Sequence, residues 1–115
     1  MQRYQWDSVE KEPLNPLLAR QVIHGERITV ARIHLSKGAL VPEHAHANEQ
    51  ISMLERGKLR FSIAGQELIA EAGDVVQIPP HAPHWVEAIE DSLATDIFSP
   101  VREDWRSGDD AYLRK

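Results

Sequence analysis

The sequence predicts an all-β domain, either a sandwich or a barrel of short strands. Many short apolar runs are separated by seven prolines and six glycines, and only one segment could form a helix. A chain of 115 residues is long enough for one domain, which buries roughly two-thirds of the unfolded surface. The chain has no cysteine, so disulfide bonds, thiolate metal ligands and cysteine nucleophiles are excluded.

The expected elements follow the turn signals along the chain. The segment "NPLLARQVI" could be a helix, but its proline and its β-branched end equally allow a strand. Residues 27–36 are β-branched and lie between "HGE" and "KG", which predicts a strand. Four strands then follow in "QISMLERGKLRFSIAGQELIAEAGDVVQIPP", and "HWVEAI" and "SLATDIF" predict two more. The breaks within the four fall at glycines that can adopt positive φ: Arg56-Gly57, Ala64-Gly65 and Ala72-Gly73.

This pattern divides the chain into three parts. We expect an N-terminal segment with an edge strand in residues 1–26, the barrel core in residues 27–100 and a charged tail in residues 101–115. The tail lacks strand periodicity. Its residues Trp105, Tyr112 and Leu113 are apolar enough to dock on the domain or on a partner subunit, and the alternative is a poorly ordered chain end.

The overall charge and hydropathy restrict the partners. A formal net charge of −5 argues against a nucleic-acid partner, because phosphate binding requires a basic surface. The first residues lack the apolar core of a signal peptide, and no apolar run approaches the length of a membrane span. We therefore expect a cytoplasmic protein that binds no membrane.

The stretch "PEHAHANEQ" holds the first candidate metal ligands. In an extended chain, His44 and His46 lie on the same face and can converge on one ion. Gln50 shares their parity if the strand continues, although "ANE" can contain a bend. His84 follows a Pro-Pro turn at the start of a new strand and would complete the ligand set. The alternatives are that the paired histidines are surface residues and that Gln50 is a hydrogen-bonding neighbour.

The other three histidines have no spacing that would bring them to the same ion. His24 lies beside a turn glycine, His81 lies between prolines, and His34 shares a strand face with Arg32. We expect none of them to be a ligand.

The spacing of glycines, prolines and histidines resembles the two cupin motifs. The first match comprises Gly38, His44, His46, Gln50 and Gly57, with glutamine where cupins have glutamate. The second comprises Gly73, Pro79 and His84, with His81 in place of a glycine and Ala88 in place of an asparagine. The resemblance implies a small single-domain cupin β-barrel, or jelly roll. It also implies one divalent ion, which could be zinc, nickel, manganese or iron, held by His44, His46, Gln50 and His84.

The glutamine has a chemical consequence. It removes one negative charge from the ligand set, so a bound divalent ion would keep its full charge and accept an anionic ligand more readily. The neutral set stabilises a trivalent ion less. The sequence thus favours carboxylate, enol or alkoxide chemistry over oxygen activation.

A second group of polar residues lies in "ATDIFSPVRED". Asp96 and Phe98 alternate to one face of a strand, and Arg102 follows a proline. If this face is the barrel interior, the aspartate can transfer a proton and the arginine can bind a substrate carboxylate. The alternative is structural, with Phe98 in the core and Asp96 paired with Arg102.

The same segment resembles the small pectin-degradation cupins, which linearise 4,5-unsaturated uronates. That resemblance implies that Asp96, Phe98 and Arg102 line the substrate site. We expect a metal-dependent isomerase or lyase that acts on a small carboxylated sugar or keto acid, and the resemblance favours ring opening of a 4,5-unsaturated uronate. A non-catalytic module that binds a small anion and a metal-dependent dioxygenase are the alternatives. We also expect a homodimer, because sheet edges need cover and the stretch Trp6 to Ile23 is long enough to cross onto a neighbour.

Overall fold

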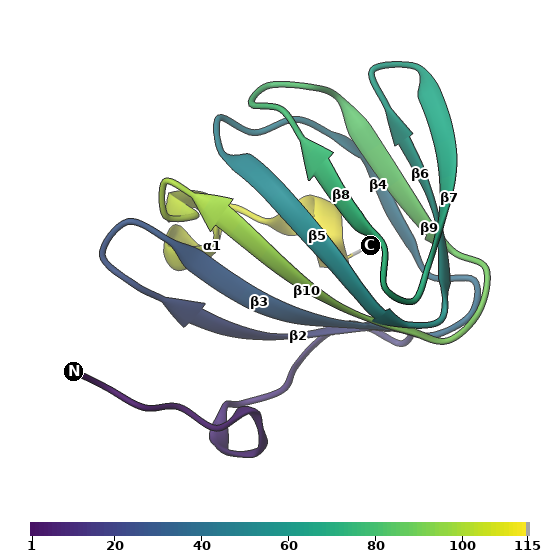
Figure 1. The fold of residues 1–115 in the computed structure, drawn as a ribbon. Coiled ribbons are helices and arrows are strands. Elements are labelled where there is room, and N and C mark those ends of the chain that lie inside the picture. The colour runs from purple at the N-terminus through teal and green to yellow at the C-terminus, as the bar shows by residue number, and fades with distance from the viewer. Residues whose placement is uncertain (115) are drawn as a thin grey trace.

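Two antiparallel sheets face each other and enclose the core (Figure 1). The computed structural model describes residues 1–114. The larger sheet has the order β1-β2-β3-β10-β5-β8, with β1 Glu12–Asn15, β2 Leu18–His24, β3 Thr29–Leu35, β10 Ser92–Ser99, β5 Glu49–Arg56 and β8 Val75–Ile78. The smaller sheet has the order β4-β9-β6-β7, with β4 Leu40–His44, β9 His84–Ala88, β6 Lys58–Ile63 and β7 Gln66–Glu71. This arrangement confirms the small single-domain β-barrel that we expect from the sequence.

Alternation along the strands explains which residues reach the interior. In β5, the side chains of Gln50, Ser52 and Leu54 are buried, whereas Glu49 and Ile51 on the other face are exposed. The inner face of this central strand therefore carries two polar groups followed by an apolar one. The apolar core packs around Leu54 and contains side chains from both sheets. Among them, Leu59, Phe61, Ile78 and Ala94 are almost fully buried.

The predicted breaks between strands are turns in the structure. Residue Gly57 joins β5 to β6 with φ of +96°, and a Cβ atom there would lie 2.2 Å from the Oγ atom of Ser92. Only glycine fits this position, because both the backbone conformation and the space exclude a side chain.

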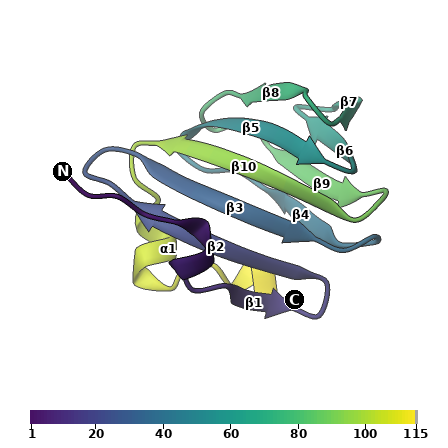
Figure 2. The same cartoon turned by 60° about the horizontal axis from the view of Figure 1, so that its bottom comes forward.

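The segment that could have been a helix or a strand is a strand. Its residues 18–23 form most of β2, and its first residue, Asn15, ends β1. These two strands lie at the edge of the larger sheet (Figure 2). β2 pairs along its whole length with β3 of the same chain, from Leu18 opposite Leu35 to His24 opposite Thr29. A short 3-10 helix, Trp6–Ser8, precedes these strands and is held by Gln21, whose Nε2 donates to the Trp6 carbonyl oxygen at 2.7 Å.

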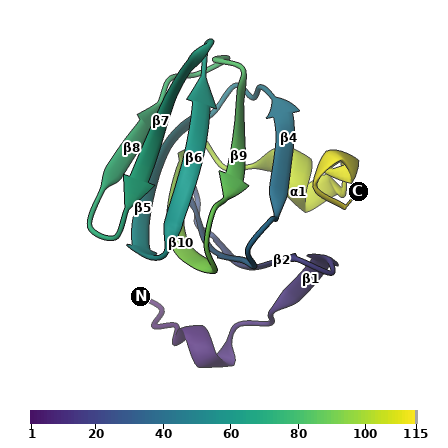
Figure 3. The same ribbon diagram turned by 90° about the vertical axis from the view of Figure 1, so that its right-hand side faces the viewer.

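The C-terminal tail folds onto its own domain beside β4 (Figure 3). It forms the short helix α1, Glu103–Ser107, and the 3-10 helix η2, Ala111–Arg114. Leu113 is buried in the core, and Trp105 and Tyr112 pack against it. The docking that their apolar character predicts is thus found within the chain. No helix in residues 1–114 is long and apolar enough to cross a membrane.

Candidate metal centre

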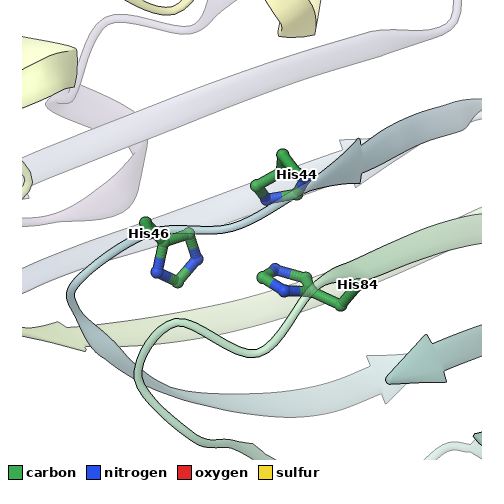
Figure 4. A group of neighbouring side chains, drawn as sticks. All are labelled: His44, His46 and His84. Atoms are coloured by element: carbon green, nitrogen blue, oxygen red, sulfur yellow. The ribbon is translucent and has the colours of Figure 1, made fainter. Parts of the chain in front are cut away.

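Three histidines come together at the end of β4 and the start of β9 (Figure 4). His44 is the last residue of β4, and the register places it opposite His84, the first residue of β9. His46 lies two residues beyond the end of β4. One ring nitrogen from each histidine lies within 4.8 Å of the other two. Strand pairing therefore brings together the residues that the sequence analysis selected by spacing.

Backbone carbonyl groups set the orientation of these rings. Each Nδ1 atom lies 2.8–3.0 Å from a carbonyl oxygen two residues away in the chain. These oxygens belong to Pro42 for His44, Asn48 for His46 and Ala82 for His84. A carbonyl oxygen only accepts hydrogen bonds, so Nδ1 carries the proton in the neutral ring and Nε2 keeps a lone pair. This second contact is typical of histidines that bind metals.

The surroundings also keep the rings neutral. Burial, with smaller contributions from the nearby His84 and His46, lowers the pKa of His44 to about 4, although the hydrogen bond to the Pro42 carbonyl acts in the opposite direction. Burial and the positive charge of Arg102 lower the pKa of His46 to about 4. The pKa of His84 is lowered by burial as well. Neutral imidazole is the form that binds a metal ion, so at neutral pH these three side chains need not release a proton first.

Gln50 approaches the histidines from the opposite sheet. The chain bends over residues 45–48, so the parity argument does not extend to Gln50, which lies in β5. Its Oε1 atom is 3.1 Å from Nε2 of His46. With the proton of His46 on Nδ1, two lone pairs face each other at this contact. A cation between them removes the repulsion, and the set of three imidazole nitrogens and one amide oxygen fits a divalent metal ion.

The residues expected to bind a substrate line a cavity of about 60 Å³ beside this cluster. Its wall includes His44, Gln50, His84, Asp96, Phe98 and Arg102, together with Trp105 and Tyr112 from the tail. Phe98 is 2% exposed and meets the ring of His46 edge-on, with centroids 5.8 Å apart. It therefore serves both the core and the cavity wall.

Asp96 is an unusual carboxyl group. It lies in β10, and its Oδ1 atom is buried without a hydrogen-bond partner among residues 1–114. Burial raises the pKa of Asp96 to about 6, although a hydrogen bond from Ser52 and the charge of Arg102 act in the opposite direction. A carboxyl group with this pKa can both donate and accept a proton near neutral pH.

Arg102 is buried, and its acidic partner is Asp104. The structural alternative had instead paired it with Asp96. Its Nε and Nη2 atoms donate to both oxygens of Asp104, at 2.9 and 2.7 Å, and Nη2 also donates to the hydroxyl of Tyr112 at 2.8 Å. Among residues 1–114, no ion pair joins it to Asp96. The guanidinium lies over the rings of Phe98 and Trp105, at 4.7 and 4.3 Å. Nη1 makes no hydrogen bond within the described chain, so it can donate to a ligand.

Three residues of the site were not identified from the sequence. Ser52 has the same parity as Gln50 in its strand, and that signal could have revealed it. The role of Asp104 and the contact of Tyr112, whose ring stacks on His44 with centroids 4.6 Å apart, depend on the fold of the tail and left no such signal.

The remaining histidines lie outside the cluster, as expected. His24 hydrogen-bonds Thr29 at 2.9 Å, and His34 hydrogen-bonds Gln21 at 2.8 Å. His81 is exposed, and its backbone N–H donates to the carbonyl oxygen of His46 at 2.8 Å. His81 thus supports the loop of a candidate ligand through its backbone alone.

Comparison with known proteins gives findings of three kinds: a family match, similar solved structures and a similar sequence. Residues 31–98 match the Cupin domain family (Cupin_2). The structure is similar to an RmlC-like cupin from Shewanella frigidimarina NCIMB 400, with a TM-score of 0.84 and 29% identity over 89% of this chain and 93% of that one. It is also similar to KdgF from Halomonas sp., with a TM-score of 0.80 and 27% identity over 86% of this chain and 94% of that one.

The third finding is a similarity in sequence. Acireductone dioxygenase 1 from Pectobacterium atrosepticum is 30% identical over 82 residues, which cover 63% of this chain and 47% of that protein. The chain thus spans about half the length of this curated relative.

Proposed function

The chain belongs to the cupin family, and on that premise we propose that it is a metal-dependent enzyme that opens the ring of a small 4,5-unsaturated uronate. One observation carries this proposal. Three of the four candidate metal ligands line the same cavity as Asp96, Phe98 and Arg102. The similarity to KdgF, a uronate-linearising cupin, supports the substrate class. The resemblance of "DIFSPVRED" to the pectin-degradation cupins supports it independently.

His44, His46, Gln50 and His84 would hold one divalent ion, with zinc, nickel, manganese and iron all compatible with these donors. When bound, the ion supplies Lewis-acid stabilisation of negative charge on substrate oxygens. All four donors are neutral, so the site as a whole stays positive and favours an anionic substrate.

Arg102 binds the substrate's carboxylate. Asp104 and Tyr112 fix the guanidinium plane through its Nε and Nη2 atoms, which leaves Nη1 to donate to the substrate. Phe98 lies under the guanidinium and forms the wall against the sugar ring. A fixed cation and a flat apolar wall together restrict the orientation of the substrate.

Asp96 transfers the proton. The 4,5 double bond is an enol ether beside the carboxylate, and ring opening requires a proton at C4. The bond between C1 and the ring oxygen then breaks, that oxygen becomes a ketone at C5, and the C1 hydroxyl loses its proton to become an aldehyde. One proton is added and one is released, so the reaction is an isomerisation that consumes no co-reactant. A positioned carboxyl group accelerates such a transfer by roughly 10²–10⁴-fold.

The test follows the alkene absorbance of unsaturated uronates in the presence of the metal-loaded protein. We expect the wild type to remove this absorbance and Asp96→Asn to lower kcat by about 10²–10⁴-fold when both proteins are loaded with metal to the same extent. Arg102→Lys keeps the charge but loses the fixed fork, so it should raise KM more than it lowers kcat. Unchanged turnover in Asp96→Asn would refute the proton-transfer role. Failure of every unsaturated uronate with the wild type would refute the substrate class.

A dioxygenase is the second candidate, and the similarity to acireductone dioxygenase 1 favours it. The neutral amide of Gln50 argues against it, because a set of neutral ligands stabilises a higher oxidation state poorly. Oxygen consumption by the iron-loaded protein with an acireductone would favour the dioxygenase. Binding of a uronate without turnover would instead favour the non-catalytic anion-binding module.

A further inference from the structure

The polar groups behind the metal ligands form a chain that ends at Asp96. We propose that Ser52 is a positioning residue, which holds the amide of Gln50 so that its oxygen, rather than its nitrogen, faces the metal. This inference rests on the metal site of the proposed function. It adds a residue that does not touch the metal and explains why a glutamine occupies this ligand position.

The geometry connects the three side chains in sequence. Gln50 and Ser52 lie two residues apart on the inner face of β5 and are 6% and 3% exposed. The Nε2 atom of Gln50 donates to Oγ of Ser52 at 2.9 Å. The register of β5 and β10 places Ser52 opposite Asp96, and the two side chains are hydrogen-bonded. Because an ionised carboxylate only accepts, the serine hydroxyl donates to Asp96 and accepts from Gln50.

These hydrogen bonds have only one favourable arrangement of donors and acceptors when Asp96 is ionised. One hydrogen of the Gln50 amide goes to Ser52, and the other points toward Oδ2 of Asp96 at 3.5 Å. Both donors of the amide are therefore directed away from the histidines, and Oε1 faces Nε2 of His46 at 3.1 Å. An inverted amide would place its oxygen near the carboxylate and take the serine proton away from it. Ser52 thus transmits the charge of Asp96 to the orientation of a metal ligand.

The same contacts account for the difference from the usual cupin glutamate. A glutamate at position 50 would place a second carboxylate close to Asp96, in a buried region where two negative charges repel strongly. A glutamine avoids this repulsion and also supplies the donors that Ser52 and Asp96 accept. The glutamine ligand and the partly buried Asp96 are therefore expected to depend on each other.

The main test measures the affinity of the purified protein for Co²⁺ and the visible spectrum of the Co²⁺ complex. Ser52→Ala should weaken Co²⁺ binding by about 10–100-fold and change the spectrum. Ser52→Thr keeps the hydroxyl, and a neighbouring cavity of about 40 Å³ can accept its methyl group, so this variant should restore most of the affinity. Ser62→Ala is the matched control, because Ser62 is a buried serine of β6 that lines neither this cavity nor the one beside the metal centre.

Each outcome has a separate meaning. Equal Co²⁺ affinity and equal spectra for Ser52→Ala and Ser62→Ala, with binding by the wild type intact, would overturn the positioning role alone. Failure of the wild type to bind Co²⁺ would overturn the proposed metal site together with this inference. Neither result depends on turnover of a uronate.

A second experiment tests the dependence between the two positions in metal-free protein. Gln50→Glu should lower the thermal midpoint, because it adds a carboxylate near Asp96. Adding Asp96→Asn should recover stability beyond the sum of the two single effects. Additive effects would overturn the coupling.

Discussion

The buried ion pair between Arg20 and Asp110 should decide whether the tail stays on the barrel. The two side chains are 4% and 1% exposed and contact each other through Nη2 and Oδ2. Arg20 comes from β2, whereas Asp110 immediately precedes η2, which carries Tyr112 to the metal centre. Replacing Asp110 by alanine leaves the buried guanidinium of Arg20 with Glu12 as its remaining ion-pair partner among residues 1–114.

The magnitude follows from this geometry. Removing one partner of a buried ion pair costs about 3–5 kcal/mol, because the other charge remains in a region of low dielectric constant. Glu12 is partly exposed and stays paired with Arg20 at 3.1 Å, so we expect the lower end, about 3 kcal/mol. For a domain of this size, such a loss lowers the midpoint of thermal unfolding by about 10–15 °C.

The assay is urea unfolding and thermal unfolding of Asp110→Ala beside Asp109→Ala. Asp109 is exposed and has no ion pair within residues 1–114, so its replacement should change the free energy of unfolding by less than about 0.5 kcal/mol. If both variants lose the same stability, the buried pair does not hold the tail and the reasoning fails.

Two further predictions concern acid and assembly. Burial raises the pKa of Asp110, but hydrogen bonds from Arg114 and Arg20 outweigh it and lower the pKa below its usual 3.8. The ionised pair therefore stabilises the fold above pH 3.8 and loses this effect as the pH falls through the lowered pKa, so the stability difference between wild type and Asp110→Asn should shrink only below about pH 4. The homodimer remains a prediction, and we expect the second chain to lie on the larger sheet, where the apolar residues Val30, Ile97 and Ile51 are aligned. Light scattering at micromolar concentration should give twice the chain mass of 13.1 kDa, and the mass of a single chain would contradict the dimer.

The structural features that depend on local patterns could be predicted from the sequence. Glycines marked the turns between β5, β6, β7 and β8 because those positions adopt positive φ. Alternation placed Asp96 and Phe98 on one face of β10, and the spacing of His44 and His46 placed them together. In each case the relevant geometry spans only a few residues, so a periodic pattern was sufficient.

The rest depends on contacts between distant parts of the chain. Gln50 reaches the histidines from the other sheet, and parity within one strand could not show that. The partner of Arg102 is Asp104 in α1, part of the tail that packs on the barrel through Trp105 and Leu113. The choice between helix and strand for "NPLLARQVI" was decided by pairing with β3. No short pattern contains this information.

The metal content of purified protein tests the central claim most directly. We predict one divalent ion per chain in the wild type by elemental analysis, and loss of that ion from His46→Ala under mild dialysis. His81→Gly is the control, because His81 lies outside the cluster and its φ of 65° suits glycine. It should retain the ion. Equal metal content in His46→Ala and the wild type would contradict the metal centre.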